Sequence, residues 1–239
     1  MSKLYVVGIG PGGREHMTLR ALEVIAQCEV VIGYTYYIEL IQELVQDKKI
    51  IKTGMKGELE RCRRAIEEVR QGYDTCIIST GDAGLYGMAG PILELAEDVQ
   101  VELIPGVTSA FAAAAEVGAP IMHDFCTISL SDLLTPWEVI AKRLDAAASA
   151  DFAIALYNPK SMGRPEHIKR AVEIISKHKS SHTPVALVKN AGREGTEKKL
   201  VTLGTLDYDF IDMMTMVLIG NGNSYIKSGR MLTPRGYVL

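Results

Sequence analysis

Three glycine-rich segments in the first half of the chain have the composition of loops that hold a ligand through backbone atoms. Residues 8–13 read GIGPGG and fit the pattern G-x-G-x-x-G, residues 80–87 read TGDAGLYG, and residues 104–110 read IPGVTSA. Each segment follows a short apolar run that is typical of a buried strand. Because glycine lets a backbone approach a ligand closely, these segments are the first candidates for a binding site.

The second and third segments also carry side chains that can hydrogen-bond. Asp82 can accept from an amino or hydroxyl group, and Thr108 or Ser109 can cap the helix that we expect to follow. In open α/β sheets, ligands bind at the carboxyl ends of the strands, where these residues should lie. The alternative for each segment is an ordinary loop with a helix cap.

A G-x-G-x-x-G turn after a strand also suggests a dinucleotide-binding dehydrogenase or regulatory module. That class needs an acidic residue after the second strand to hold the ribose hydroxyls, and here the strand ends in Gly33 and Tyr34. Pro11 removes a backbone donor from the turn, and no G-K-[ST] follows it. We therefore rank this hypothesis below a binding site built from all three segments.

Three segments in the second half also place polar residues at expected strand ends. They are residues 157–159 (YNP), 189–194 (KNAGRE) and 212–215 (DMMT). Each can be a simple turn. Together with the first-half loops they predict a small-molecule site in a cleft between two domains.

The elements that position these segments alternate between apolar runs and amphipathic stretches. In the first half we expect strands at residues 4–8, 30–32, 50–52, 75–79 and 101–104, and helices at 18–27, 36–45, 58–71, 91–97 and 107–117. In the second half we expect strands at 127–130, 152–157, 185–188, 200–206 and 216–220, with helices at 137–147 and 165–177. The pattern predicts two α/β domains, residues 1–119 with a mainly parallel sheet and residues 120–239 with a mixed sheet.

Composition narrows the class of protein. The chain has 239 residues and a formal net charge of −3, and it has no basic stripe, which argues against a nucleic-acid partner. No apolar run approaches the roughly 20 residues of a membrane span, and the N-terminal run is interpreted as a strand, so we expect a cytoplasmic protein. Cys28, Cys62, Cys76 and Cys126 are expected to be reduced thiols, and we expect no metal site. His178 and His182 have i,i+4 spacing, but they lie at a helix end, where a metal pair is not expected.

Six segments in order along essentially the whole chain resemble the tetrapyrrole (corrin/porphyrin) methyltransferase family. VGIGPGG resembles its first loop, with Gly13 where the family usually has aspartate. TGDAGLYG resembles its G-D-P-x-x-Y-G loop with Ala83 for proline, and IPGVTS its P-G-[IV]-[TS]-[SA] turn. Residues 33–37 (GYTYY), 155–161 (ALYNPKS) and 189–195 (KNAGREG) look most like the branch that methylates C-17 of precorrin-3B or cobalt-factor III in cobalamin biosynthesis.

This resemblance implies an S-adenosylmethionine-dependent methyltransferase, with the cofactor folded in a cleft between the two domains and S-adenosylhomocysteine as product. It assigns one wall of the cofactor site to Pro11, Gly81, Asp82, Leu85 and Tyr86, and the methionine portion to Thr108, Ser109 and Ala110. The adenosine would be held from the second domain by Leu130, Tyr157, Asn158, Ala191, Thr215 and Met216. The family is usually homodimeric.

The implied substrate is a tetrapyrrole polycarboxylate whose ring is contracted as it is methylated. Basic residues expected near it are Arg14, Lys52, Lys56, Lys189 and Arg193, whereas the arginines at 61, 63, 64 and 70 are expected on a solvated helix face. The catalytic acid and base stay unassigned among Tyr34, Tyr36, Tyr37, His123 and Asp124. Other substrates of the family also stay open: another corrin carbon, uroporphyrinogen, a diphthamide side chain or ribosomal RNA.

Overall fold

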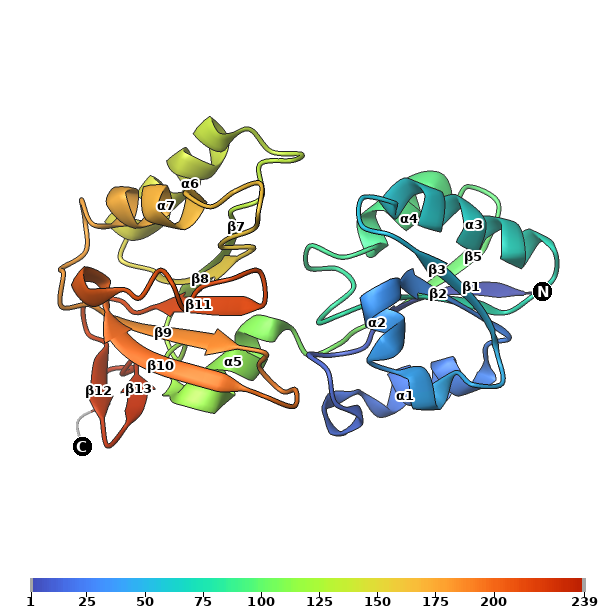
Figure 1. Ribbon diagram of the computed structural model, residues 1–239, viewed down its shortest axis with the longest axis horizontal. Coiled ribbons are helices and arrows are strands. Elements are labelled where there is room, and N and C mark those ends of the chain that lie inside the picture. The colour runs from blue at the N-terminus through green and yellow to red at the C-terminus, as the bar shows by residue number, and fades with distance from the viewer. Residues whose placement is uncertain (1, 238–239) are drawn as a thin grey trace. The chain divides into compact units, whose positions relative to one another are not determined.

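The computed structural model describes residues 2–237, which form two compact α/β units, Met1–Ser109 and Ala110–Leu239 (Figure 1). The α/β fold with a parallel first sheet and a mixed second sheet is confirmed. The division between the units falls ten residues before residue 119, the end of the first expected domain.

The first unit is built on a five-stranded parallel sheet in the order β3-β2-β4-β1-β5. Its strands are β1 (Lys3–Gly8), β2 (Val30–Tyr34), β3 (Lys49–Thr53), β4 (Thr75–Ser79) and β5 (Gln100–Ile104). The helices are α1 (Leu19–Gln27), α2 (Thr35–Glu39), α3 (Glu58–Arg70) and α4 (Ala89–Leu95), with 3₁₀ turns at Arg14–His16 and Gln42–Leu44. Alternate side chains of β1 face opposite cores, because successive strand residues point to opposite faces. Helices α1 and α2 cover one face, and α3 and α4 cover the other (Figure 1).

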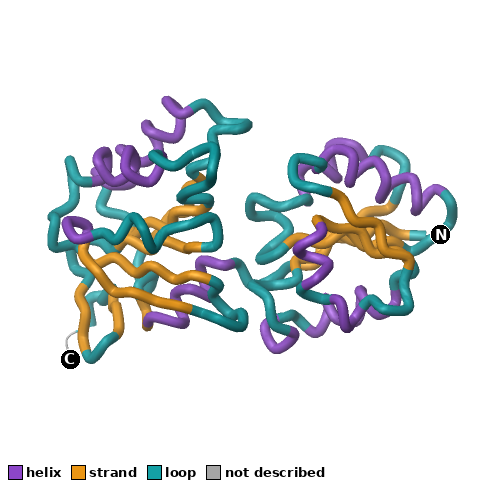
Figure 2. Tube along the Cα trace, viewed as in Figure 1, coloured by secondary structure: helices purple, strands orange, loops and turns teal. Residues whose placement is uncertain are grey.

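The second unit, whose strands are orange in Figure 2, is built on a mixed five-stranded sheet in the order β10-β9-β11-β8-β7. Its strands are β7 (Phe125–Ser129), β8 (Ala153–Tyr157), β9 (Pro184–Lys189), β10 (Glu197–Thr202) and β11 (Thr215–Ile219). Helices α6 (Trp137–Ser149) and α7 (His167–Ile175) cover one face. A small sheet joins β6 (Gly118–Ala119), β13 (Arg230–Leu232) and β12 (Tyr225–Lys227), and a 3₁₀ turn lies at Leu203–Thr205.

Helix α5 (Ser109–Val117) accounts for the position of the boundary between the units. Its buried alanines and Val117 pack against Ala155, Ala186 and Val188 on the second face of the mixed sheet. Apolar burial is the main driving force for such packing, so this helix belongs to the second core rather than the first. The sequence pattern predicts the helix but does not indicate which sheet it covers.

Several local expectations differ from the structure. The helix expected at residues 36–45 is the short α2 followed by a 3₁₀ turn. On α3, Arg61 is 4% exposed although we expected a solvated face. Strand β10 begins at Glu197 rather than near residue 200, because it is an edge strand whose first three residues are charged and exposed.

The cysteines are free thiols, as expected. Cys28, Cys62 and Cys76 are buried and Cys126 is half-buried. Burial raises the pKa of the Cys62 thiol to about 11. A buried thiol of this kind is a small apolar core residue rather than a nucleophile.

Candidate functional site

The three glycine-rich loops of the first unit lie next to one another. Strands β4, β1 and β5 are parallel neighbours, so their carboxyl ends meet at one edge of the sheet. Beyond the strands, Gly10 and Gly81 form an isolated bridge: Gly10 N donates to Gly81 O at 3.1 Å and Gly81 N donates to Gly10 O at 2.7 Å. The loops after β1 and β4 therefore continue side by side past the sheet.

Glycine is required where the third loop meets the other two. A Cβ on Gly106 would lie 2.2 Å from the carbonyl oxygen of Gly81 and 2.7 Å from the carbonyl carbon of Gly8. A Cβ on Gly8 would in turn lie 2.7 Å from Gly106 N. Contacts this short do not occur, so the backbones of Gly8, Gly81 and Gly106 meet without room for a side chain on Gly8 or Gly106.

Asp82 joins the loops after β4 and β5. Its Oδ1 accepts from the N–H groups of Gly84 at 2.8 Å and Leu85 at 3.2 Å. Its Oδ2 accepts from the N–H of Gly106 at 3.0 Å. Charge-assisted hydrogen bonds are stronger than neutral ones, so this carboxylate fixes the two loops against each other. Asp82 is thus a loop-positioning residue, with lone pairs left for a ligand.

The space beside Gly81 is lined by polar groups of the third loop. Gly81 has φ +67°, and a Cβ built on it would lie 3.6 Å from Ser109 N and 4.0 Å from Thr108 Oγ1. A Cβ there would make ordinary van der Waals contacts, so Gly81 packs directly beside a hydroxyl and a backbone N–H at the start of α5. Such N–H groups lack partners inside the helix and suit a carboxylate.

The remaining first-unit candidates flank this space. Pro11 is buried in the first loop, Leu85 is half-buried and Tyr86 is exposed. Tyr86 has φ +56°, a conformation that non-glycine residues seldom adopt and that is frequent at functional sites.

The second-unit candidates also gather at one edge of their sheet. Strands β7, β8 and β9 end there, and the antiparallel β11 begins there, as the pairs Ser129–Tyr157 and Thr215–Lys189 show. The edge carries all six residues that the resemblance assigned to this domain: Leu130, Tyr157, Asn158, Ala191, Thr215 and Met216. Strand-end positions were therefore predicted well in both units.

Most of these second-unit side chains are turned into the protein. Leu130 belongs to the core under α6 and α7, and Ala191 and Met216 belong to the core under α5. Ala110, assigned to the methionine portion, is likewise fully buried. Any ligand contact by these four residues must use mainly backbone atoms.

Tyr157 and Asn158 hold the neighbouring elements in place. The hydroxyl oxygen of Tyr157 accepts from the N–H of Ala110 at 3.2 Å, at the start of α5. Asn158 has φ +51°, and its Nδ2 donates to Ser129 Oγ at 2.9 Å. Asparagine tolerates this left-handed backbone better than most residues, which explains its place at the end of β8.

Lys189, expected near a substrate carboxylate, is engaged inside the protein. Its Nζ lies 3.1 Å from Asp212 Oδ2 and 4.7 Å from the centre of the Phe210 ring. Asp212 Oδ1 also accepts from Thr215 Oγ1 and Met214 N, each at 2.9 Å. Burial acts to raise the pKa of Asp212, but these hydrogen bonds and the Lys189 charge outweigh it, so the pKa lies below its ordinary value.

The other basic and acid–base candidates are spread over strands, helices and loops of their own units. Arg14, Lys52 and Lys56 are exposed, and Arg193 is half-buried in the loop after β9. Tyr34 and Tyr37 form an edge-to-face pair with ring centres 5.2 Å apart, and Tyr36 lies 6.3 Å from Tyr37. His123 and Asp124 are exposed, and together with Met122 and Arg235 they line a cavity of about 320 Å³.

Sequence reasoning missed two features near the strand ends. Arg61 is buried, and it donates to Thr53 Oγ1 at 2.7 Å and to Gly54 O at 3.2 Å, which supports the loop after β3. In the second unit, His167 Nε2 lies 2.9 Å from Asp132 Oδ2, and this hydrogen bond holds the pKa of Asp132 below its ordinary value. For the His167–Asp132 pair, the only signal in the sequence was the position of Asp132 just after an expected strand.

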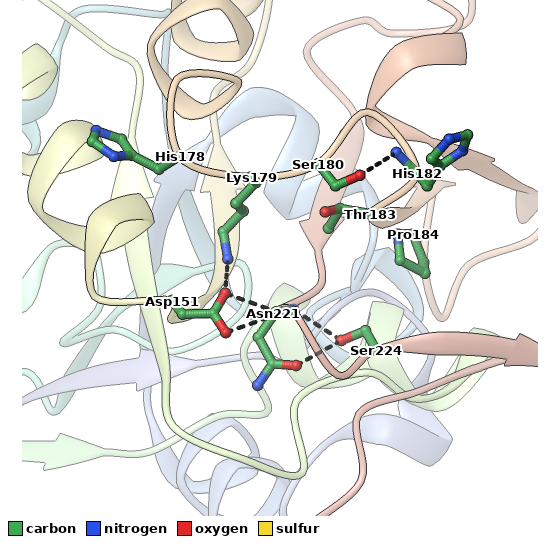
Figure 3. Close-up of a pocket in the computed structure, with 10 residues that line it drawn as sticks. Asp151, His178, Lys179, Ser180, His182, Thr183, Pro184, Asn221 and Ser224 are labelled. Atoms are coloured by element: carbon green, nitrogen blue, oxygen red, sulfur yellow. Dashed lines mark hydrogen bonds and ion pairs between the residues drawn. The ribbon is translucent and has the colours of Figure 1, made fainter.

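A polar cavity of about 260 Å³ lies at the opposite edge of the second sheet, where β9 begins and β11 ends (Figure 3). Lys179 Nζ lies 2.8 Å from Asp151 Oδ1, and both carboxylate oxygens of Asp151 accept from Gly222 N. Just outside the cavity, Asp145 lies 2.8 Å from the Nε2 of His178, one of its lining residues. Lys179 and Asp151 of the cavity bind each other, and His178 binds the adjacent Asp145. We therefore assign these residues a structural role.

Within residues 2–237 there is no group of three or more His, Cys, Asp or Glu side chains placed to hold a metal ion. The same residues contain no helix long and apolar enough to cross a membrane.

The comparisons with known proteins agree with this geometry. The family described as Tetrapyrrole (Corrin/Porphyrin) Methylases matches residues 3–207. A probable cobalt-factor III C(17)-methyltransferase of Salmonella typhimurium is 52% identical over 99% of this chain and 100% of that protein. A precorrin-3B C(17)-methyltransferase of a Sinorhizobium species is 39% identical over 98% of this chain and 96% of its own. The crystal structure of the methyltransferase CobJ superposes with a TM-score of 0.93 at 31% identity, covering 98% of this chain and 100% of that one. The chain belongs to the tetrapyrrole methylase family.

The contact among the three glycines leads to a test of stability. Replacing Gly106 with alanine places a methyl group against the Gly81 carbonyl, and overpacking of this kind costs about 1–3 kcal/mol. We expect a melting temperature several degrees below that of the wild type.

Gly54→Ala, in the exposed loop after β3, is the matched control for that substitution. A Cβ at Gly54 meets nothing within 4 Å and its φ is not left-handed, so alanine should stabilise the protein by about 0.4–1 kcal/mol through the unfolded state. The Gly54→Ala protein should melt at or above the wild-type temperature. Equal melting temperatures for the two variants would contradict the close contact.

Proposed function

We propose that this protein is an S-adenosylmethionine-dependent methyltransferase of cobalamin biosynthesis that methylates C-17 of a corrinoid, with ring contraction. The observation that carries the proposal is the full-length match to relatives named for this reaction. The strand-end loops of each unit support it, because they offer backbone and hydroxyl groups to a small ligand.

We propose cobalt-factor III as the preferred substrate over precorrin-3B. The relative named for cobalt-factor III is 52% identical to this chain, and the relative named for precorrin-3B is 39% identical. Cobalt would then enter with the substrate, in keeping with the lack of a metal-binding cluster within residues 2–237.

The first-unit loops fit the methionine portion of the cofactor. Its carboxylate suits the start of α5, where the N–H of Ser109 and the hydroxyl of Thr108 lie next to Gly81. Its ammonium group suits the remaining lone pairs of Asp82 and nearby carbonyl oxygens. Pro11, Leu85 and Tyr86 complete the set of first-unit residues proposed to contact the cofactor.

The second-unit residues are proposed to hold the adenosine. Tyr157, Asn158 and Thr215 offer polar side chains at the sheet edge, although Thr215 is nearly buried. Leu130, Ala191 and Met216 offer backbone N–H and carbonyl groups, since their side chains are in the core. Ala110 takes the same backbone role at the start of α5.

S-adenosylmethionine supplies a methyl group on a sulfonium, a leaving group that needs no activation by the protein. The residues of this chain therefore have to bind, align and exclude water, and alignment can lower a barrier by about 7–11 kcal/mol at best. Ring contraction needs proton transfers as well. For these we propose the tyrosines at 34, 36 and 37 and the pair His123 and Asp124.

We further propose a cytoplasmic homodimer that acts on small molecules, without a nucleic-acid or membrane partner. The net charge of −3 and the lack of a basic stripe along the chain support the absence of a nucleic-acid partner. The alternative dehydrogenase function is disfavoured, because β2 ends in Gly33 and Tyr34 without an acid.

Mass spectrometry tests the reaction. Purified protein is incubated anaerobically with methyl-labelled S-adenosylmethionine and either cobalt-factor III or precorrin-3B. We expect one labelled methyl group on the macrocycle, transferred faster to cobalt-factor III. A protein that binds S-adenosylhomocysteine but methylates neither compound would contradict the proposed substrate and keep the family.

Thermal shift tests the cofactor class. A ligand that binds only the folded state at 100 times its Kd stabilises it by about 2.7 kcal/mol. We therefore expect S-adenosylhomocysteine to raise the melting temperature by several degrees and NAD to leave it unchanged. Stabilisation by NAD alone would favour the dehydrogenase hypothesis.

A further inference from the structure

Arg164 lies in the loop that leads from β8 to α7, and its guanidinium is only partly hydrogen-bonded within residues 2–237. Its Nη1 is buried and has no hydrogen-bond partner among residues 2–237. The guanidinium makes one hydrogen bond, from Nε to Ser161 Oγ at 3.2 Å. A buried donor without an acceptor is unfavourable, and such groups concentrate where a ligand supplies the missing partner.

The loop around Arg164 is rigidly built. Ser161 and Arg164 exchange two backbone hydrogen bonds, of 3.3 and 3.0 Å, which close a tight turn. Lys160 Nζ donates to Tyr208 O at 3.0 Å, and Asn158 Nδ2 donates to Ser129 Oγ at 2.9 Å. A guanidinium held by such a turn is preorganised, because little side-chain freedom is left to lose on binding an anion.

An acidic group near Arg164 is committed elsewhere. Asp132, in the loop after β7, interacts electrostatically with Arg164, but no ion pair joins them. Instead Asp132 Oδ2 lies 2.9 Å from the Nε2 of His167, whose ring packs edge-on against Trp137 at 5.0 Å. Asp132 therefore leaves the guanidinium without a carboxylate partner, and a guanidinium is well suited to bind an external carboxylate with two parallel hydrogen bonds.

Apolar side chains lie on the same two loops. Met162, at the tip of the Ser161–Arg164 turn, is 102% exposed, and Leu134, in the loop after β7, is 98% exposed. The parallel pairing of β7 and β8 places both loops at the edge that carries Leu130 and Asn158. Exposed apolar groups beside a half-buried cation match a ligand with a flat apolar ring and carboxylate arms.

We propose that Arg164 binds a carboxylate side chain of the macrocyclic substrate and that Met162 and Leu134 contact the rim of its ring. This inference rests on the proposed corrinoid substrate and adds a residue that determines substrate orientation. Arg164 would not touch the transferred methyl group. It would act on substrate affinity and leave cofactor affinity unchanged.

The test compares Arg164→Gln with Arg143→Gln, an exposed arginine on α6 of the same unit. The dissociation constant of cobalt-factor III is measured by absorbance titration, and that of S-adenosylhomocysteine by calorimetry. We expect Arg164→Gln to weaken corrinoid binding about 10- to 100-fold, equivalent to ~1.4–2.8 kcal/mol, with the KM raised more than kcat is lowered. Arg143→Gln should match the wild type, and Arg164→Lys should recover part of the affinity.

Two further readouts separate substrate binding from a structural role. Removal of a buried unpaired donor should not lower the melting temperature of Arg164→Gln. Fully methyl-esterified cobalt-factor III should bind the wild type and Arg164→Gln with similar affinity, because the ester lacks the carboxylate.

Equal affinity of the wild type and Arg164→Gln for the free acid would overturn this inference while leaving the proposed function intact. A wild-type protein that binds neither cobalt-factor III nor precorrin-3B would overturn the proposed function and this inference with it.

Discussion

The carboxylate of Asp82 holds together the part of the first unit on which the candidate site depends. It accepts three backbone hydrogen bonds from two loops. Where these loops meet the loop after β1, Gly8 and Gly106 leave no room for a Cβ. The glycines allow the backbones of Gly8, Gly81 and Gly106 to approach, and the carboxylate fixes the loops there, so that Thr108 and Ser109 lie beside Gly81.

In the second unit, other contacts hold the candidate residues at one edge of the sheet. Asn158 and Asn190 take left-handed conformations at the ends of β8 and β9, and side chains such as Tyr157 and Asp212 hold the neighbouring backbone. Core side chains fill the space behind them. The edge therefore presents mostly backbone groups, which suits methyl transfer, since a sulfonium donor needs alignment more than activation.

The fold and the strand-end positions of both sets of candidate residues were predictable, because the signals are local. Glycine, proline and asparagine after apolar runs mark strand ends, and neighbouring parallel strands bring those ends together. The features that the sequence did not predict depend on tertiary contacts. Arg61 is buried because Thr53, Gly54 and Met88 accept its hydrogen bonds, and these contacts cannot be predicted from the periodicity of the helix. Likewise, the unsatisfied Nη1 of Arg164 and the packing of α5 on the second sheet exist only once distant segments meet.

The central claim is that Asp82 shapes a cofactor site in the first unit, and calorimetry of S-adenosylhomocysteine with Asp82→Asn tests it most directly. Asparagine keeps one acceptor but turns an NH₂ group toward the N–H of Gly106, so the link between the two loops is lost. Asp47→Asn, an exposed site in the same unit, is the control. The account predicts a Kd at least about tenfold weaker for Asp82→Asn, equivalent to ~1.4 kcal/mol, and no change for Asp47→Asn. Wild-type affinity in a folded Asp82→Asn protein would contradict it.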